Sequence, residues 1–233
     1  MNQDSDQPIA GRVFQFAAAV LVINVALVGW ALYIGAAKGN PERHFEETGF
    51  ITWVSYFQLL ATGAFGIGTY VARRKAAPRF WSAVVVWLLA GVGFIVLAID
   101  ERHRYHEKLD NALHDMFKLT ESAWSDRIDD LIILSYGLIG IGVLWVCRKE
   151  VLMFRPALRF LYIGFAGLGL MVMIDVFSNR GDLLKSMGAG DDAESMVRWF
   201  GAVEDSIKLL AEAFFLIGFF AIFLSARRLA RKG

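Results

Sequence analysis

A dense group of histidines and carboxylates lies between residues 100 and 114. Three of the four histidines of the chain fall in this stretch, and acids are interspersed among them. Imidazole together with carboxylate suits zinc, copper or non-haem iron better than magnesium or calcium. The stretch therefore predicts a site for a divalent transition metal, whose identity stays open. The candidate residues in it are Asp100, His103, His106, Glu107, Asp110 and His114.

These residues could share one face of a helix. No proline or glycine interrupts residues 100–119, and the leucine, lysine, glutamate and alanine there favour helix. At about 100° per residue, the six candidates fall on one stripe of a helix that continues the apolar run 81–99. We therefore expect the third hydrophobic segment to extend as one helix beyond the membrane. The order His-x-x-His-Glu at 103–107 differs from the His-Glu-x-x-His of zinc proteases.

Two other interpretations of this stretch stay open. Arg102, Arg104 and Lys108 could pair with the neighbouring acids at helical spacing, which would make the stretch a solvated face near the lipid headgroups. The imidazoles and acids could instead relay protons. The residue types alone do not decide between a metal site, a proton relay and a solvated helix.

The composition is that of a membrane protein. Hydrophobic residues make up 56% of the 233 residues, and the mean hydropathy is +0.47, whereas soluble domains are usually about 45–50% apolar. An apolar run needs about 20 residues to cross the hydrocarbon core. We predict an all-α bundle of six transmembrane helices that forms a single integral membrane domain, residues 1–233. The predicted spans are residues 13–37, 51–72, 81–99, 131–147, 157–177 and 207–225.

The basic residues predict which way the bundle faces. Lysine and arginine concentrate after the second, fourth and sixth predicted spans. These places share one side of the membrane, so the positive-inside rule assigns them and both termini to the cytoplasm. All four histidines then lie on the opposite side. The expected location is a bacterial-type inner membrane, with the histidine-rich loops on the periplasmic or extracellular side.

Ionisable residues also occur in and beside the last two predicted spans. Asp175 lies near the outer end of the fifth, and Glu204, Lys208 and Glu212 follow at four-residue spacing along the sixth. A charged group inside a membrane helix costs about 2.5–3.5 kcal/mol, so such residues are functional by default. Asp175 and Glu204 are expected at the depth of the histidines and could complete their site. Alternatively, Lys208, which lies between Glu204 and Glu212, could neutralise one of these acids and act as a buried tether between helices.

Smaller residues predict how the helices pack. Small side chains allow membrane helices to approach closely, so we expect close contacts where glycine recurs as Gly-x-x-Gly-x-Gly. Single polar residues within the spans could hydrogen-bond to site residues or between helices. The glycines are residues 63, 66 and 68, residues 137, 140 and 142, and residues 164, 167 and 169. The polar candidates are Ser55, Gln58, Ser135 and Tyr136.

Three functions fit these observations. The leading hypothesis is a metal-dependent membrane protein, which, if catalytic, acts on a lipid or small amphipathic substrate and uses Glu107 or Glu212 as proton acceptor. The second is a proton- or cation-coupled transporter that uses intramembrane acids. The third is a non-catalytic subunit of a larger membrane complex. The net charge of +1 gives no reason to expect nucleic acid as a partner in any of the three. The metal ligands in the leading hypothesis are His103, His106, Asp110, His114, Asp100, Asp175 and Glu204.

Overall fold

A computed structural model describes residues 7–46, 49–74, 82–117, 128–178 and 193–232. All regular structure in these residues is helical, which confirms the all-α prediction. The long helices are α1 (Gln7–Ala37), α2 (Phe50–Arg74), α3 (Val85–His103), α5 (Ile128–Val146), α7 (Arg155–Ser178) and α9 (Ala193–Lys232). The shorter ones are α4 (Tyr105–Phe117), α6 (Arg148–Val151) and the 3₁₀ helix η3 (Leu152–Phe154).

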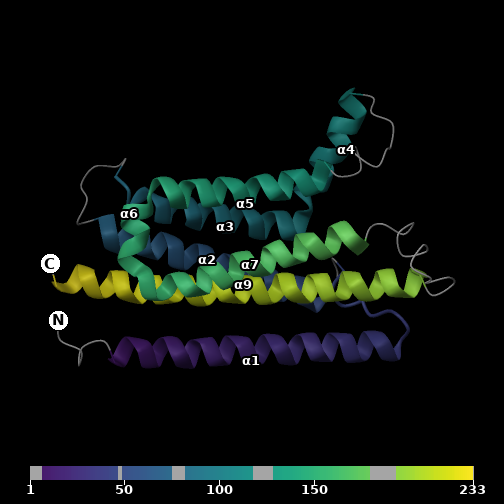
Figure 1. Cartoon of the computed structure of the whole chain (residues 1–233), viewed down its shortest axis with the longest axis horizontal. Coiled ribbons are helices and arrows are strands. Elements are labelled where there is room, and N and C mark those ends of the chain that lie inside the picture. The colour runs from purple at the N-terminus through teal and green to yellow at the C-terminus, as the bar shows by residue number, and fades with distance from the viewer. Residues whose placement is uncertain (1–6, 47–48, 75–81, 118–127, 179–192, 233) are drawn as a thin grey trace.

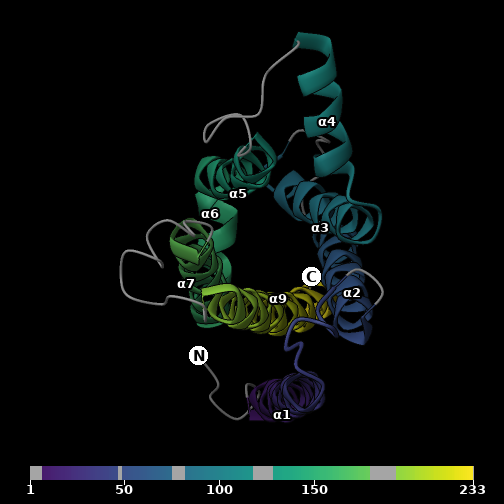
Figure 2. The same ribbon diagram turned by 90° about the vertical axis from the view of Figure 1, so that its right-hand side faces the viewer.

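The long helices run roughly along one common axis (Figure 1). α2 packs against both α3 and α9, and α9 also packs against α7 and α1. Seen along the axis, α5, α3, α2, α9 and α7 follow one another around the bundle, and α1 lies outside them, next to α9 (Figure 2). α6 connects α5 to α7 at one end, while α4 projects from the other end (Figure 1).

Several helices have the length and apolar composition of membrane spans. In the described part of the chain four qualify: Ile9–Ala37, Phe50–Arg74, Arg148–Ile174 and Ser195–Arg231. Large apolar side chains such as Phe14, Tyr162 and Val146 are 66–80% exposed on the bundle surface, as expected where lipid is the solvent. The chain is therefore a helical, multi-pass membrane protein.

The α6 end of the bundle has an aromatic core. Trp87 of α3 is fully buried. Its ring meets Phe154 of η3 edge-on at 5.3 Å between centroids, and Phe219 of α9 at 6.2 Å. Edge-to-face aromatic pairs contribute about 0.5–1.5 kcal/mol beyond the area they bury. Trp87 thus packs α3 against η3 and α9, which are distant from it in the sequence.

Glycines allow α2 and α3 to approach closely. Gly63 and Gly66 of α2 face Gly91 of α3, and a Cβ added at Gly66 would lie only 2.8 Å from the Cα of Gly91. Likewise, a Cβ at Gly91 would lie 2.8 Å from the carbonyl oxygen of Gly63. This contact confirms the predicted role of the first glycine set, because any side chain here would push the two backbones apart.

The other two glycine sets behave differently from one another. Gly164 and Gly167 of α7 pack against α9, where a Cβ at Gly167 would lie 2.9 Å from the Cβ of Ala211. In contrast, a Cβ at residues 137, 140 or 142 would meet no atom of the described structure within 4 Å. The prediction of close packing is therefore wrong for the α5 glycines, since the motif fixes their spacing but not which helix face meets a neighbour.

Replacing Gly91 with alanine is expected to destabilise the protein by about 1–3 kcal/mol, because overpacking forces α2 and α3 apart. This cost should exceed the gain in helix propensity of roughly 1 kcal/mol. Gly93→Ala is the matched control in the same helix, because a Cβ there meets nothing within 4 Å. Unfolding in mixed detergent micelles, followed by circular dichroism, measures both variants. Equal stability of the two would contradict the proposed contact.

The third helix continues past residue 99 and the stretch beyond it is helical, as predicted, but the prediction of one continuous helix is wrong. α3 ends at His103, and Arg104 has the left-handed backbone angles φ 52° and ψ 49°. The Arg104 N–H donates to the carbonyl oxygen of Asp100 at 2.6 Å, which closes the end of α3. α4 then starts at Tyr105 and leaves in a new direction (Figures 1 and 2). The candidate residues between 100 and 114 therefore lie on two helices rather than on one continuous face.

Candidate functional site

A group of charged side chains lies where α2, α3 and α9 meet. Lys208 Nζ on α9 is 2.8 Å from Glu101 Oε1 on α3 and 3.8 Å from Asp205 Oδ1 on its own helix. Glu212 lies one helical turn further along α9 and is only 5% exposed. We call Glu101, Asp205, Lys208 and Glu212 the acid–lysine cluster. It contains three carboxyl groups and one ammonium, so the fully ionised cluster carries excess negative charge.

A small cavity adjoins the acid–lysine cluster. Its volume is about 10 Å³, which is close to the space that one water molecule needs. Polar and apolar side chains from α2, α3, α9 and the α1–α2 connection surround it, so a water there would lie beside the carboxylates of Glu101 and Asp205. The lining residues are Phe45, Ile51, Thr52, Ser55, Glu101, Asp205, Lys208 and Leu209.

Two buried oxygens at the cluster lack a hydrogen bond of good geometry within the described structure, although the two side chains that carry them are hydrogen-bonding neighbours. They are Glu212 Oε2 on α9 and Ser55 Oγ on α2. The two side chains lie close enough to influence each other, and Ser55 also lines the small cavity. An unsatisfied buried polar group costs about 1–3 kcal/mol. A proton on Glu212, or a water between these groups, would remove part of that cost.

The connection between α1 and α2 covers the cluster. Phe45 lines the cavity, and Thr52 Oγ1 anchors the connection by donating to the carbonyl oxygens of Phe45 at 3.1 Å and Glu46 at 2.9 Å. His44 of this connection packs against the start of α2, with its ring 5.2 Å from that of Phe50. The segment therefore shields the charged group from one side.

Glu42 extends the acidic environment into this connection. Its carboxylate packs directly against Gly201 of α9 and leaves no room there for a side chain. Burial, together with the negative charges of Asp205 and Glu46, raises the pKa of Glu42, while Arg198 acts in the opposite direction. Glu42 therefore takes up a proton more readily than a carboxylate in water.

The predicted site residues lie in several different environments. Asp100 is 6% exposed and lies near Tyr136 of α5, while its neighbour Glu101 turns to α9. His103 is exposed at the end of α3, with its ring 5.7 Å from that of Tyr105. His114 on α4 and Glu204 on α9 are half-buried. The side chains of His106, Glu107, Asp110 and Asp175 lie outside those that the structure describes.

The predicted metal site gains no support from the described side chains. Among them, no group of three or more histidines, cysteines, aspartates or glutamates could hold a metal ion. The left-handed Arg104 also separates Asp100 and His103 from the candidates on α4. Because four candidate side chains lie outside the described set, metal binding at this end of the bundle stays a prediction.

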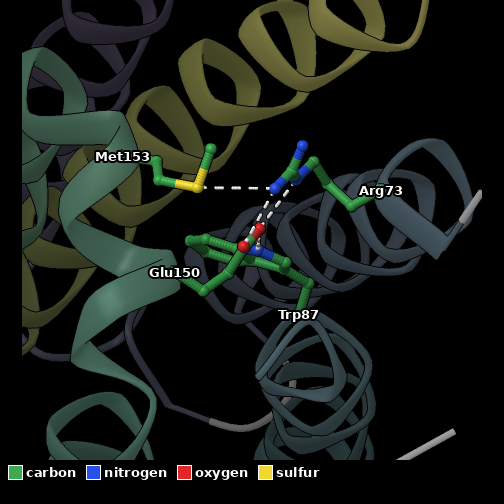
Figure 3. Close-up of polar contacts among 4 residues, drawn as sticks. All are labelled: Arg73, Trp87, Glu150 and Met153. Carbon is green, nitrogen blue, oxygen red and sulfur yellow. Dashed lines mark hydrogen bonds and ion pairs between the residues drawn. The ribbon is translucent and has the colours of Figure 1, made fainter. Parts of the chain in front are cut away.

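A second buried ion pair lies near the opposite end of α3 (Figure 3). Arg73 of α2 donates to Glu150 of α6 through two nitrogens, with Nε 2.8 Å from Oε1 and Nη2 3.0 Å from Oε2. Trp87 Nε1 also donates to Glu150 Oε1 at 3.2 Å, and Arg73 Nη2 lies 3.4 Å from the sulfur of Met153. The Arg73 and Glu150 side chains are 12% and 6% exposed. These contacts join α2, α3 and α6, so we interpret the group as structural.

An amide pair fastens α1 to the bundle. Gln58 Nε2 of α2 donates to Asn24 Oδ1 of α1 at 2.8 Å, and Asn24 Nδ2 donates to the carbonyl oxygen of Val20 at 2.8 Å. Both amides are buried. Gln58 therefore serves helix packing rather than the charged site, which is one of the two roles that its position in the sequence predicts.

Sequence reasoning missed Glu101 and Glu150 as partners. Glu150 did leave a signal, because it is the single acid in the basic stretch 147–160, and a lone acid among arginines favours a buried pair. The sequence gives no comparable signal for Glu101, because Glu101 is one of nine acids between residues 100 and 130. Glu101 becomes the partner of Lys208 because α2 packs against both α3 and α9 and so brings these two helices together.

The bundle as a whole matches a protein family. A family model described as "Domain of unknown function (DUF8692)" matches residues 13–223. The chain belongs to the DUF8692 family. No curated protein and no solved structure matches this DUF8692 chain. The matched residues contain both the acid–lysine cluster and the Arg73–Glu150 pair, so both groups lie within the DUF8692 region.

Proposed function

We propose that this protein is a proton-coupled membrane transporter in which the acid–lysine cluster binds and releases protons, and that protons also pass through it when its second solute is absent. The observation that supports this most is Glu212, which is buried one turn from an already paired Lys208 and has an oxygen that lacks a hydrogen bond of good geometry in the described structure. Like charges held close together favour protonation of one of them. Buried carboxyl groups in membrane helices are typical of proton relays in pumps and transporters.

Lys208 favours a proton over a metal ion at this cluster. Its ammonium lies 2.8 Å from Glu101 and 3.8 Å from Asp205. A metal ion bound by the same oxygens would lie beside this fixed positive charge and be repelled by it. A proton also adds positive charge, but it attaches to one carboxylate oxygen and needs no further ligands. Glu212, further from the ammonium along α9, is the natural acceptor.

We also propose six spans with both termini in the cytoplasm of an inner membrane. α3 and α5 have 19 residues each, which is about 28 Å at 1.5 Å per residue and near the thickness of the hydrocarbon core. The start of α1 and the end of α9 lie at the same end of the bundle (Figure 1), as an even number of crossings requires. In this orientation the acid–lysine cluster lies toward the periplasmic side.

Proton uptake into liposomes tests the transport proposal. Reconstituted wild-type protein is expected to acidify the lumen, reported by a trapped pH-sensitive dye, when a potassium diffusion potential drives protons inward. Glu212→Gln should abolish the uptake, because an amide cannot exchange a proton with its neighbours. Wild-type liposomes that acidify no faster than empty ones would contradict the proposal.

Glu46→Gln is the matched control for this assay. Glu46 carries an exposed carboxylate at the same end of the bundle, which accepts a hydrogen bond from Asn40 Nδ2 at 3.4 Å. It should keep the wild-type rate, because it lies at the surface and not among the groups around Lys208. Equal loss of uptake in Glu46→Gln and Glu212→Gln would assign the effect to surface charge and would refute the role of Glu212.

A further inference from the structure

A groove lies between α2 and α9 at the end of the bundle that carries the Arg73–Glu150 pair. Its volume is about 470 Å³, within the range of about 300–1,000 Å³ that is typical of small-ligand sites. Both helices that form it qualify as membrane spans, and the groove lies at their C-terminal ends. Gly68, Val71 and Ala72 line it from α2, and Phe223, Arg227 and Arg231 from α9.

The floor of the groove is apolar. Gly68 lies directly on the ring of Phe223, since a Cβ there would be 2.8 Å from Phe223 Cε2. Val71 stands beside it with 60% of its surface exposed. The glycine lets α2 pack directly on the Phe223 ring, and a hydrocarbon chain could lie along Gly68, Val71 and the edge of this ring without burying a polar side chain.

One side of the groove is strongly basic. Arg227 and Arg231 are spaced by four residues, so both point from the same face of α9, and both are exposed. The Arg227 guanidinium lies 5.5 Å from the centre of the Phe223 ring, a cation–π contact that holds it at the groove. No acid is among the described residues that line the groove. The site therefore attracts anions.

We propose that this groove binds one anionic phospholipid. Its phosphate would lie between Arg227 and Arg231, and one acyl chain would lie along Gly68, Val71 and Phe223. Guanidinium groups bind phosphate oxygens through paired N–H donors, and basic pockets between membrane helices are suited to acidic lipid headgroups. This proposal does not depend on the transport activity, because the groove and the acid–lysine cluster lie near opposite ends of the bundle.

Native mass spectrometry of the full-length protein in mild detergent tests the proposal. Titration with phosphatidylglycerol should give one tightly bound lipid, and phosphatidylcholine should bind more weakly. Arg227→Gln/Arg231→Gln should weaken phosphatidylglycerol binding by about 30-fold, because each basic residue contributes about 1 kcal/mol toward an anionic lipid. Equal binding of the two lipids by the wild-type protein would overturn the proposal.

Arg148→Gln/Lys149→Gln is the charge-matched control. It removes two exposed basic residues, one of which also stacks on an aromatic ring, with Arg148 5.4 Å from the centre of Trp145. These residues lie on and beside α6, outside the groove lining. The control should keep the wild-type affinity for phosphatidylglycerol, and a loss equal to that of the groove variant would overturn the assignment to the groove.

Val71→Trp separates lipid binding from simple phosphate binding. The exposed position of Val71 admits a larger side chain without disturbing the core, and the added indole covers the apolar floor while leaving both arginines in place. Phosphatidylglycerol should bind this variant more weakly than the wild type. Acyl-free glycerophosphoglycerol should bind the wild-type protein weakly. If it binds as tightly as the lipid, the groove recognises the phosphate alone and the proposal is wrong.

Discussion

Replacing Glu150 with alanine is expected to lower the free energy of unfolding by about 3–5 kcal/mol, because the buried Arg73 guanidinium loses its only anionic partner among the contacts shown in Figure 3. The indole N–H of Trp87 loses its acceptor as well. Burial makes the penalty large, since the Arg73 side chain is only 12% exposed and Trp87 is fully buried. Unfolding in mixed micelles, followed by the helical signal, measures the change.

Three further variants test whether the loss of stability comes from breaking the buried Arg73–Glu150 pair. Glu150→Gln should cost less than Glu150→Ala, because the amide oxygen can still accept from Trp87. Arg73→Met/Glu150→Met should be milder than the sum of the two single changes, because it leaves no unpaired buried charge. Arg74→Ala removes an exposed arginine beside Arg73 and should change stability by no more than about 0.5 kcal/mol. If Arg74→Ala costs as much as Glu150→Ala, the loss is not specific to the buried pair.

Replacing Lys208 with methionine is expected to destabilise the protein by about 2–3 kcal/mol, because Glu101 and Asp205 then lie close together without their shared cation. The cost should be smaller than at Glu150, since Lys208 and Glu101 keep 26% and 19% of their side-chain surface exposed. Methionine has a similar length and shape, so packing changes little. Thermal unfolding of the detergent-solubilised protein provides the measurement.

The double variant Lys208→Met/Glu101→Gln tests the pairing directly. Removing one negative charge together with the positive one should restore about half or more of the lost stability, as expected for two groups that interact. Lys149→Met, an exposed lysine on α6, should stay within about 0.5 kcal/mol of the wild type. Additive effects in the double variant would show that Lys208 and Glu101 do not form the pair seen between α3 and α9.

The sequence by itself determined the features that depend on local composition. The long apolar runs fix helices of membrane-spanning length, because only internally hydrogen-bonded backbone is stable in lipid. The four-residue spacing of Lys208 and Glu212 places both on one side of α9, because the pitch of a helix is constant. The spacing of Gly63 and Gly66 likewise predicts a close helix contact, which Gly91 completes.

Only the tertiary structure decided which of these groups meet. The left-handed Arg104 ends α3 where propensity favours a continuous helix, because the conformation of a single residue depends on contacts that propensity does not contain. The choice of Glu101 for Lys208, and of Glu150 for Arg73 and Trp87, joins residues 63–107 positions apart in the chain. Side-chain pairing across helices depends on their rotation and depth, and packing of the whole bundle sets both.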